Sequence, residues 1–295
     1  MKAHFHRVPR SIEQNYLARQ HTLPNFGTIW HYHPELELHY IIRGEGVRFV
    51  GDNISNFYPT ELLLLGENLP HMWRCSEKYF AGDPHVTAEA IVVHFMPEFM
   101  GNDLLKMTEA GLLTNLFERA KNGLMIEGKT KKQVFRLMQQ SVAEQGLKRA
   151  FKILEMLIVL ADSRELVPIT TSQRTYRYNH EETTRLNEVY QYMLNNYSRD
   201  LPLDEIAAVA NLSVTSFCRY FKMMTKKTFH DFLIELRISH ARQLLMSDSP
   251  RSVENICFEC GFNNRSNFFT HFKRITGYTP LEFKKKYSSV ASFDW

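Results

Sequence analysis

The sequence predicts a two-domain α+β protein, with an N-terminal antiparallel β-barrel that carries a helical appendix and a C-terminal all-α domain. Short apolar runs separated by turn residues fill the first third of the chain, a pattern typical of strands. From about Asp103 the apolar residues recur at helical spacing, and helical patterns continue from Thr184 to Tyr287. A length of 295 residues suits two domains, since one domain usually takes about 100–200 residues.

Composition favours a globular protein and gives no support for disorder or collagen-like order. The chain is 44% hydrophobic and 23% charged, with 13 Gly and 11 Pro. Met1–Arg10 lacks the apolar core of a signal peptide, and the longest apolar stretch, 153–161, is interrupted by Glu155. We therefore expect a cytoplasmic protein without a membrane partner.

The cysteines indicate neither a disulfide framework nor a zinc site. There are four in the chain, and the single Cys257-x-x-Cys260 pair has no second pair to complete a set of zinc ligands. We interpret all four as small apolar residues. They are Cys75, Cys218, Cys257 and Cys260.

Charge is distributed unevenly along the chain, although the net charge is only +4. Residues 1–118 contain 9 Lys+Arg and 14 Asp+Glu, whereas residues 119–178 contain 12 and 5. Residues 213–286 contain 13 and 6. Basic segments in an otherwise balanced protein suggest a polyanionic partner for the second half, with a solvated basic face as the alternative.

The barrel is expected over residues 1–102. Apolar and polar residues alternate from Ile29 to Phe49, and the turn Gly44-Glu45-Gly46 interrupts them. Further strands are expected at Val47–Val50, Leu62–Leu65 and Ala90–Phe95. Short strands at this spacing predict a small antiparallel barrel or sandwich.

Between the barrel and the C-terminal domain the pattern predicts about three helices and then a linker. The helical appendix covers residues 103–162, and its amphipathic helices are the natural candidates for a homodimer interface. Residues 163–183 are polar, rich in Thr and aperiodic, and are expected to be the linker.

The C-terminal domain, residues 184–290, contains an internal repeat. The pattern F-x-x-x-F-K-x-x-T-x-x-T begins at Phe217 and returns 51 residues later at Phe268. Upstream, Ile206-Ala207 matches Ile256-Cys257 at an offset of 50, so the second copy has one extra residue in its turn. Two copies of helix, turn and helix predict a tandem helix-turn-helix.

Capping residues mark where these helices begin and end. Ser213, Thr228 and Ser252 are expected to start helices, as is Asn263 or Asn264, because their side chains accept hydrogen bonds from free backbone N–H groups. The last of these helices is expected to end near Thr276-Gly277.

Each second helix is expected to bury its pair of Phe residues and to present polar side chains outward. On a recognition helix such side chains reach base edges, with Arg suited to guanine and Asn to adenine, while Lys222 and Lys273 can meet phosphates. The helix between the copies would hold them at a fixed separation. The expected base-contacting residues are Thr215, Cys218, Arg219, Arg265, Ser266, Asn267 and Thr270.

Residues from about Leu186 to Tyr287 resemble the DNA-binding domain of the AraC family of bacterial transcriptional regulators. The resemblance rests on I-A-x-x-x-x-x-S, F-L-x-E-L-R-I-S-H-A-R-x-L-L, I-C-F-E-C-G-F and F-x-x-x-F-K-R-I-T-G-Y-T-P-L-E-F. It implies double-stranded promoter DNA as a partner, with RNA polymerase as a further one, and base contacts at the positions just named. Cys218 departs from the residue types usual for a base contact.

One cluster in the first third has the residue types of a binding site. His31, His33 and Glu37 share one face if they lie on a strand, and His71 is expected to join them. The spacing resembles the first motif of the cupin barrel, and Gly66–Trp73 resembles the second, as found in effector domains of AraC-type regulators. The resemblance implies a small-molecule effector pocket, often without metal, formed by His31, His33, Glu37, His71 and Trp73.

The leading hypothesis is a dimeric regulator that responds to a small molecule, a sugar or a related metabolite, and is not an enzyme. No cofactor is expected, although His31, His33, Glu37 and His71 would suit a metal ion. One alternative is a metal-binding cupin enzyme with a DNA-binding tail. Another is a constitutive DNA-binding dimer without an effector.

Overall fold

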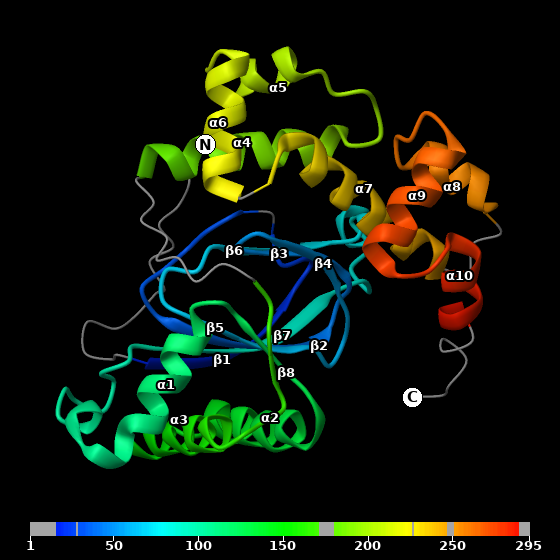
Figure 1. Ribbon diagram of the computed structural model, residues 1–295. Helices are drawn as coiled ribbons and strands as arrows, with labels where there is room; N and C mark the ends of the chain where they lie inside the picture. Colours follow the sequence, from blue (N-terminus) through cyan, green and yellow to red (C-terminus); the bar gives the residue numbers. More distant parts are fainter. Residues whose placement is uncertain (1–15, 28, 171–179, 226, 247–250, 289–295) are drawn as a thin grey trace. The chain divides into compact units, whose positions relative to one another are not determined.

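The computed structural model describes residues 16–27, 29–170, 180–225, 227–246 and 251–288 (Figure 1). These residues divide into two compact units, the first up to His180 and the second from Glu181 on, with the short segment Ile54–Asn56 grouped with the second. Strands dominate the first unit and helices make up the second, which confirms the α+β class. None of the helices in the described ranges is both long and apolar enough to span a membrane.

The N-terminal unit contains two antiparallel sheets. One has six strands in the order β1-β7-β2-β5-β8-β9, and the other has three in the order β4-β3-β6. The strands are β1 (Tyr16–Leu23), β2 (Leu36–Arg43), β3 (Gly46–Val50), β4 (Asn53–Phe57), β5 (Leu62–Leu65), β6 (His71–Cys75), β7 (Ala88–Phe95), β8 (Leu124–Ile126) and β9 (Leu166–Pro168).

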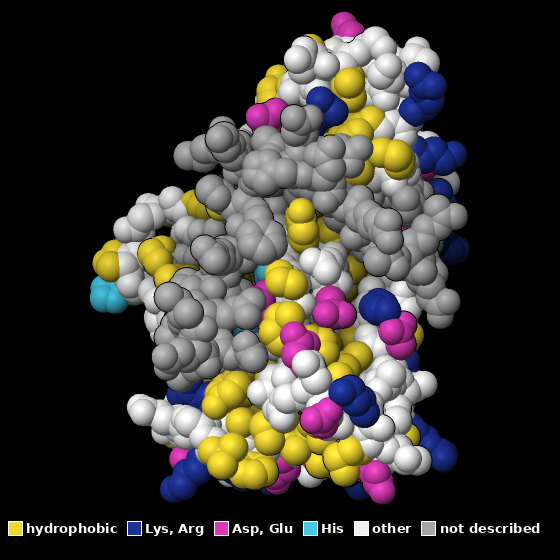
Figure 2. Space-filling view, turned by 90° about the vertical axis from the view of Figure 1, so that its left-hand side faces the viewer, with side chains coloured by type: hydrophobic (Ala, Val, Ile, Leu, Met, Phe, Trp, Pro, Cys, Tyr) yellow, Lys and Arg dark blue, Asp and Glu magenta, His cyan; other side chains and the backbone are white. Residues whose placement is uncertain are grey.

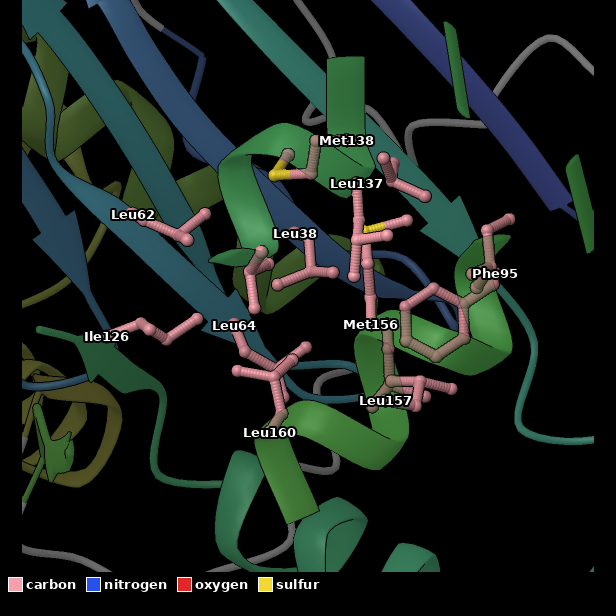
Figure 3. Close-up of a cluster of buried hydrophobic side chains, with 14 of the residues drawn as sticks. Leu38, Leu62, Leu64, Phe95, Ile126, Leu137, Met138, Met156, Leu157 and Leu160 are labelled. Carbon is pink, nitrogen blue, oxygen red and sulfur yellow. The ribbon is translucent and has the colours of Figure 1, made fainter. Parts of the chain in front are cut away.

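Three helices cover one face of the larger sheet, and the smaller sheet covers the other face (Figure 1). They are α1 (Gly111–Ala120), α2 (Gly128–Ala143) and α3 (Gly146–Ala161), and the 3-10 turns are η1 (Glu77–Phe80), η2 (Leu104–Lys106) and η3 (Thr108–Ala110). Figure 3 shows Leu38, Leu62, Leu64 and Phe95 of the sheet packed against side chains of the helices, among them Leu137 and Met156.

This layering explains the all-leucine strand β5. Leu62 and Leu64 belong to the core beneath the helices, while Leu63 and Leu65 belong to the core between the two sheets. Because successive side chains of a strand point to opposite faces, a strand buried on both faces is apolar throughout. All four leucines are accordingly buried.

The described strands do not close into the barrel that the sequence predicts. Their ladders divide into two sheets, and between Arg43 and Gly46 the chain passes from one to the other. Gly46 is required there, because a Cβ atom at this position would lie only 2.0 Å from the carbonyl oxygen of Arg74. The strand expected from Ile29 also begins later, at Leu36.

The helical appendix contains the three expected helices, but short strands accompany them. β8 follows α1 and pairs with β5, and β9 pairs with β8. β9 lies within the range 163–183 that was predicted to be a linker, so that range begins inside the N-terminal unit. Residues 171–179 of the expected linker lie outside the described part of the chain.

The C-terminal unit consists of helices whose starts agree with the predicted caps. Backbone N–H groups donate to the side chains of Ser213, Thr228, Ser252 and Asn264, and Gly277 ends a helix in the left-handed conformation with φ 78°. The helices are α4 (His180–Asn196), α5 (Leu203–Val209), α6 (Val214–Thr225), α7 (Phe229–Met246), α8 (Val253–Glu259), α9 (Arg265–Thr276) and α10 (Pro280–Ser288).

Helix α7 contributes to two small cores, one for each copy of the repeat. Near its start, Phe232 stacks on Tyr190 of α4 at a centroid distance of 5.1 Å. Toward its end, Ile238 and Leu245 pack in a cluster with Phe268 and Phe272 of α9. The helix has 18 residues and spans about 27 Å at about 1.5 Å per residue. It is therefore a shared connector between the copies.

Candidate functional site

Helices α6 and α9 lie near opposite ends of α7 in the C-terminal unit (Figure 1). Each buries a pair of Phe side chains one helical turn apart, Phe217 with Phe221 and Phe268 with Phe272, and all four are 0% exposed. The turn before α6 has four residues, 210–213, and the turn before α9 has five, 260–264. The repeat and its extra residue are confirmed.

The repeated threonine ends each of these helices in the same way. The Thr225 hydroxyl donates to the Phe221 carbonyl at 2.8 Å, and the Thr276 hydroxyl donates to the Phe272 carbonyl at 2.7 Å. Two residues later, the backbone N–H of Lys227 or Tyr278 donates back to the same hydroxyl. The repeated F-K-x-x-T pattern therefore encodes a helix terminus as well as a buried face.

The predicted DNA-contacting side chains are all exposed on α6 and α9. Two of them already have a partner within the protein: Arg265 lies 3.6 Å from a carboxylate oxygen of Glu254, and the Thr270 hydroxyl donates to the Ser266 carbonyl at 2.8 Å. Because its hydrogen is used in this bond, the exposed hydroxyl oxygen of Thr270 can act toward a ligand chiefly as an acceptor. The exposed set is Thr215, Cys218, Arg219, Lys222, Arg265, Ser266, Asn267, Thr270 and Lys273.

The N-terminal unit holds a second polar constellation, buried between its two sheets and centred on Glu37. Oε2 of this carboxylate lies 3.0 Å from Nε2 of His33, 2.9 Å from Nε2 of His94 and 3.4 Å from Nε2 of His71. Its Oε1 lies 2.7 Å from Nδ1 of His39. Four imidazoles therefore converge on one carboxylate that is only 3% exposed.

His31 and Trp73, the other residues predicted for this site, border the cluster. The backbones of His31 and His71 form an isolated bridge, and their rings lie 4.3 Å apart. Trp73 stacks on His39 at 4.0 Å, and its ring edge faces His71. The predicted residues do come together, although a strand bridge and a bend, rather than one continuous strand, place His31 and His33.

His94 is the member of the cluster that the sequence pattern did not indicate. It lies on β7, directly opposite Glu37 of β2 in the antiparallel ladder. His39 was noticeable because it has the same strand parity as Glu37. The only signal for His94 is the register between two strands far apart in the chain, which spacing alone does not reveal.

Three of these histidines have their Nδ1 atoms turned toward backbone carbonyls. Nδ1 of His31, His33 and His71 lies 2.9, 3.1 and 2.7 Å from the carbonyls of Ile29, Glu35 and Leu69. Because a carbonyl only accepts, Nδ1 donates in each case and Nε2 of a neutral ring is left as a lone pair.

For His33 and His71, that lone pair would face the Glu37 carboxylate. The arrangement therefore calls for positive charge at its centre, either protons on the imidazoles or a metal ion. The donor atoms of His31, His33 and His71, and those of His33, Glu37 and His94, lie within 4.8 Å of one another. Such nitrogen and carboxylate sets suit divalent transition metals, and the backbone hydrogen bonds to Nδ1 are typical of metal-binding histidines.

The electrostatics of the cluster favour an ionised Glu37. Burial by itself raises the pKa of this carboxyl, but the imidazoles of His94 and His71 and the hydrogen bonds from His33 and His39 outweigh it, and the pKa lies well below its usual range. Burial and the neighbouring rings of His71 and His33 hold the pKa of His31 well below its ordinary value.

Comparison with known proteins identifies the C-terminal unit. A family model described as a helix-turn-helix domain matches residues 184–286. An uncharacterized HTH-type transcriptional regulator in the cgkA 5' region of Pseudoalteromonas carrageenovora is 39% identical over 98 residues, which cover 33% of this chain and 57% of the relative. The HTH-type transcriptional activator RhaS of Klebsiella pneumoniae is 31% identical over 101 residues, 34% of this chain and 36% of the relative.

Among solved structures, a transcriptional regulator from Chromobacterium violaceum with an AraC-type DNA-binding domain is 27% identical. The alignment covers 37% of this chain and 97% of that one, with a TM-score of 0.35. The matched part of the chain spans about half the length of the first relative and about a third of the second. The family match and these relatives, which are transcriptional regulators and not enzymes, confirm the resemblance found in the sequence.

Proposed function

We propose that this chain, whose residues 184–286 form an AraC-type helix-turn-helix domain, is a regulator that reads promoter DNA with α6 and α9. The observation that carries the proposal is the division of each helix into a buried Phe face and an exposed polar face. A major groove of B-DNA admits one such helix, and two helices on one side must be about 34 Å apart to enter successive grooves. The shared helix α7 supports a fixed separation of this kind.

The exposed side chains suggest how the sequence of the operator is read. Arg219 on α6 and Arg265 on α9 have the bidentate geometry that suits guanine, and Asn267 suits adenine. Lys222 and Lys273 lie further along the same helices and are suited to phosphates, which set the register without reading bases. Thr215, Cys218, Ser266 and Thr270 complete the proposed contact surface.

The test is the affinity for an operator fragment selected from the host genome by the protein itself. Replacing Arg219 and Arg265 together by Ala should weaken binding at least about thirtyfold, since each lost base contact costs about 1–3 kcal/mol. Lys148→Ala is the matched control, because Lys148 is exposed but lies on α3 of the N-terminal unit. Unaltered affinity in the double variant would contradict the proposal.

We further propose that the N-terminal unit is a cupin-like effector domain whose ligand contacts His31, His33, Glu37, His71 and Trp73. Support comes from the convergence of these side chains and from Nε1 of Trp73, which is buried and has no hydrogen-bond partner among the described residues. Another relative of the C-terminal domain, 25% identical over 100 residues, is the melibiose operon regulatory protein of Escherichia coli. A sugar or related metabolite is therefore the first class to test.

An effector acts on DNA binding only if it binds two arrangements of the protein with different affinity. The helices α1 to α3 pack directly on the sheet that carries Glu37, which makes them the proposed relay. A panel of sugars should contain one that raises the melting temperature and changes operator affinity in the same concentration range. Trp73→Phe should weaken both effects. If no metabolite does so, the regulator is constitutive.

The helical layer is also the proposed homodimer interface. Figure 2 shows hydrophobic side chains gathered at the lower end of the molecule, over this layer. Part of this surface is an apolar cavity of about 300 Å³ between α1 and α3. The exposed apolar residues of the surface are Met107, Leu112, Leu147, Phe151 and Ile158. Phe151→Glu with Ile158→Glu should shift a dimer to a monomer in light scattering, whereas Lys148→Glu should not.

A divalent metal ion is the second candidate ligand of the histidine cluster, favoured by the Nδ1–carbonyl hydrogen bonds described above. Metal analysis on protein purified without an affinity tag distinguishes a metal ion from a metabolite as the ligand of the cluster. Stoichiometric metal that is lost in His31→Ala would support the metal. Turnover of a substrate would favour a metal-dependent enzyme with a DNA-binding tail, for which the named relatives give no support.

A further inference from the structure

A second polar site lies in the N-terminal unit, on the opposite side of β2 from the histidine cluster. It is a cavity of about 400 Å³ beside α2, here called the basic cavity, lined by Tyr40, Lys131, Lys132, Phe135 and Arg136. Glu37, His39 and Ile41 of β2 point between the two sheets, whereas Tyr40 points toward the helices. The basic cavity and the histidine cluster are therefore separate sites.

The cations of the basic cavity have no ion-pair partner among the described residues. Lys131, Lys132 and Arg136 form no ion pair within the described ranges of the chain. The nearby carboxylate of Glu61 is occupied by Arg48, whose Nε lies 3.0 Å from its Oε1. Lys132 and Arg136 are four residues apart on α2, a spacing at which like charges destabilise a helix. Lys131 interacts electrostatically with the Glu61 carboxylate, whereas Lys132 and Arg136 face the hollow without a counterion among the described residues.

Two aromatic rings form the apolar wall of the basic cavity. The rings of Tyr40 and Phe135 stack at a centroid distance of 4.0 Å and an angle of 20°, and Tyr40 is only 7% exposed. Thr60 and Gln139 add a hydroxyl and an amide at the rim. A few polar groups on an apolar, preformed wall are typical of small-molecule sites, and about 300–1,000 Å³ is their usual volume.

We propose that the basic cavity binds a small organic anion, whose carboxylate or phosphate monoester pairs with Lys132 and Arg136 while a flat or apolar body lies against Tyr40 and Phe135. The planar guanidinium of Arg136 suits the paired oxygens of either group. A hollow with a buried aromatic wall fits a compact ligand. The phosphate backbone of a DNA duplex is instead contacted by side chains that protrude from the protein surface. The proposal does not depend on the DNA-binding role of α6 and α9.

The experiment is isothermal titration calorimetry of the full chain with three probes of similar shape. Phenyl phosphate and benzoate test the two anionic groups, and benzyl alcohol tests the apolar body alone. We expect saturable binding of at least one anion with a Kd below about 1 mM and no saturable binding of the alcohol. The stronger of the two anions identifies the class of the natural ligand.

Lys132→Gln with Arg136→Gln should weaken the binding of that anion about tenfold or more, which equals about 1.4 kcal/mol. Both side chains are exposed, so the variant is expected to fold, and its circular dichroism checks this. Lys148→Gln, an exposed cation of α3 outside the basic cavity, should bind like the unaltered protein.

Two results would overturn the proposal. The first is the absence of saturable binding for both anions, or equal binding in the double variant and the control. The second is that the original protein binds neither anion while the double variant loses affinity for random duplex DNA. The cations of α2 would then belong to a surface that binds polyanions.

Discussion

Nε2 of His94 lies 2.9 Å from Oε2 of Glu37, although 57 residues separate them in the chain. The antiparallel register of β2 and β7 places the two residues opposite each other, on the faces that look toward the smaller sheet. Glu37 also receives His33 and His39, so one carboxylate organises imidazoles from three segments. Glu37 is therefore the shared partner of these imidazoles, and a second buried carboxylate, that of Glu35, lies 3.4 Å from Nδ1 of His33.

Glu37→Gln should therefore destabilise the N-terminal unit by about 3–5 kcal/mol, because removing one member of a buried charged set leaves its partners uncompensated. Urea unfolding followed by the fluorescence of Trp30 and Trp73 measures this loss. Glu118→Gln is the control, since Glu118 forms an exposed ion pair with Lys121 that is worth at most about 1 kcal/mol. Similar losses in the two variants would contradict the central role of Glu37.

Thr225→Val should lower the free energy of unfolding of the C-terminal unit by about 1–3 kcal/mol. The valine keeps the shape but leaves the backbone N–H of Lys227 without its hydroxyl acceptor in a buried place. Thr276→Val should cost less, because Thr276 is only half-buried and water can replace its hydroxyl. Scanning calorimetry compares the stability losses of the two variants. If Thr276→Val costs as much as Thr225→Val or more, the difference in burial does not determine the contribution of these threonines.

Lys273→Ala and Asn267→Ala should affect DNA binding in different ways. Loss of the proposed phosphate contact of Lys273 should weaken binding to all sequences alike and reduce the slope of log K against log salt by about 0.9. Loss of the proposed base contact of Asn267 should cost about 1–3 kcal/mol on the operator only and leave the slope unchanged. Fluorescence anisotropy at several salt concentrations distinguishes them. Identical profiles would refute the assigned roles.

The cysteines should differ sharply in reactivity. Cys218 is exposed on α6, whereas Cys260 is 0% exposed and burial raises the pKa of its thiol to about 12. Only the thiolate attacks an alkylating reagent, so at about pH 8 Cys218 should be labelled in the folded protein and Cys260 should not. Mass spectrometry of the peptides measures both. Operator DNA should slow the labelling of Cys218, and labelling that is indifferent to DNA would place that residue outside the interface.

Most of the C-terminal unit was predictable because its information is local. Caps such as Ser213 and Asn264 act within one turn of a helix, and the repeated F-K-x-x-T pattern describes contacts no further apart than one helical turn and the next two residues. The extra residue in the second turn was visible as a rise in the offset between the copies, from 50 before the turn to 51 after it. Local rules of this kind can be read without knowledge of the rest of the fold.

The N-terminal unit was less predictable because strand pairing is not local. β8 and β9 are three residues each and are strands through their pairing, β8 with the edge of β5 and β9 with β8. The predicted barrel proved to be two sheets, since alternation indicates which residues share a face but not which strands become neighbours. The sequence allowed His31, His33, Glu37 and His71 to be proposed as one site. It did not allow the distances between their side chains to be predicted.

By itself, the sequence determined the α+β class, the duplicated helix-turn-helix and the exposed face of α6 and of α9, because a helix satisfies its hydrogen bonds within its own segment. Only the tertiary structure decided that His94 completes the histidine cluster and that Tyr40 meets Phe135 beside unpaired cations. Those contacts join residues separated by dozens of positions, and strand register and sheet-to-helix packing bring them together.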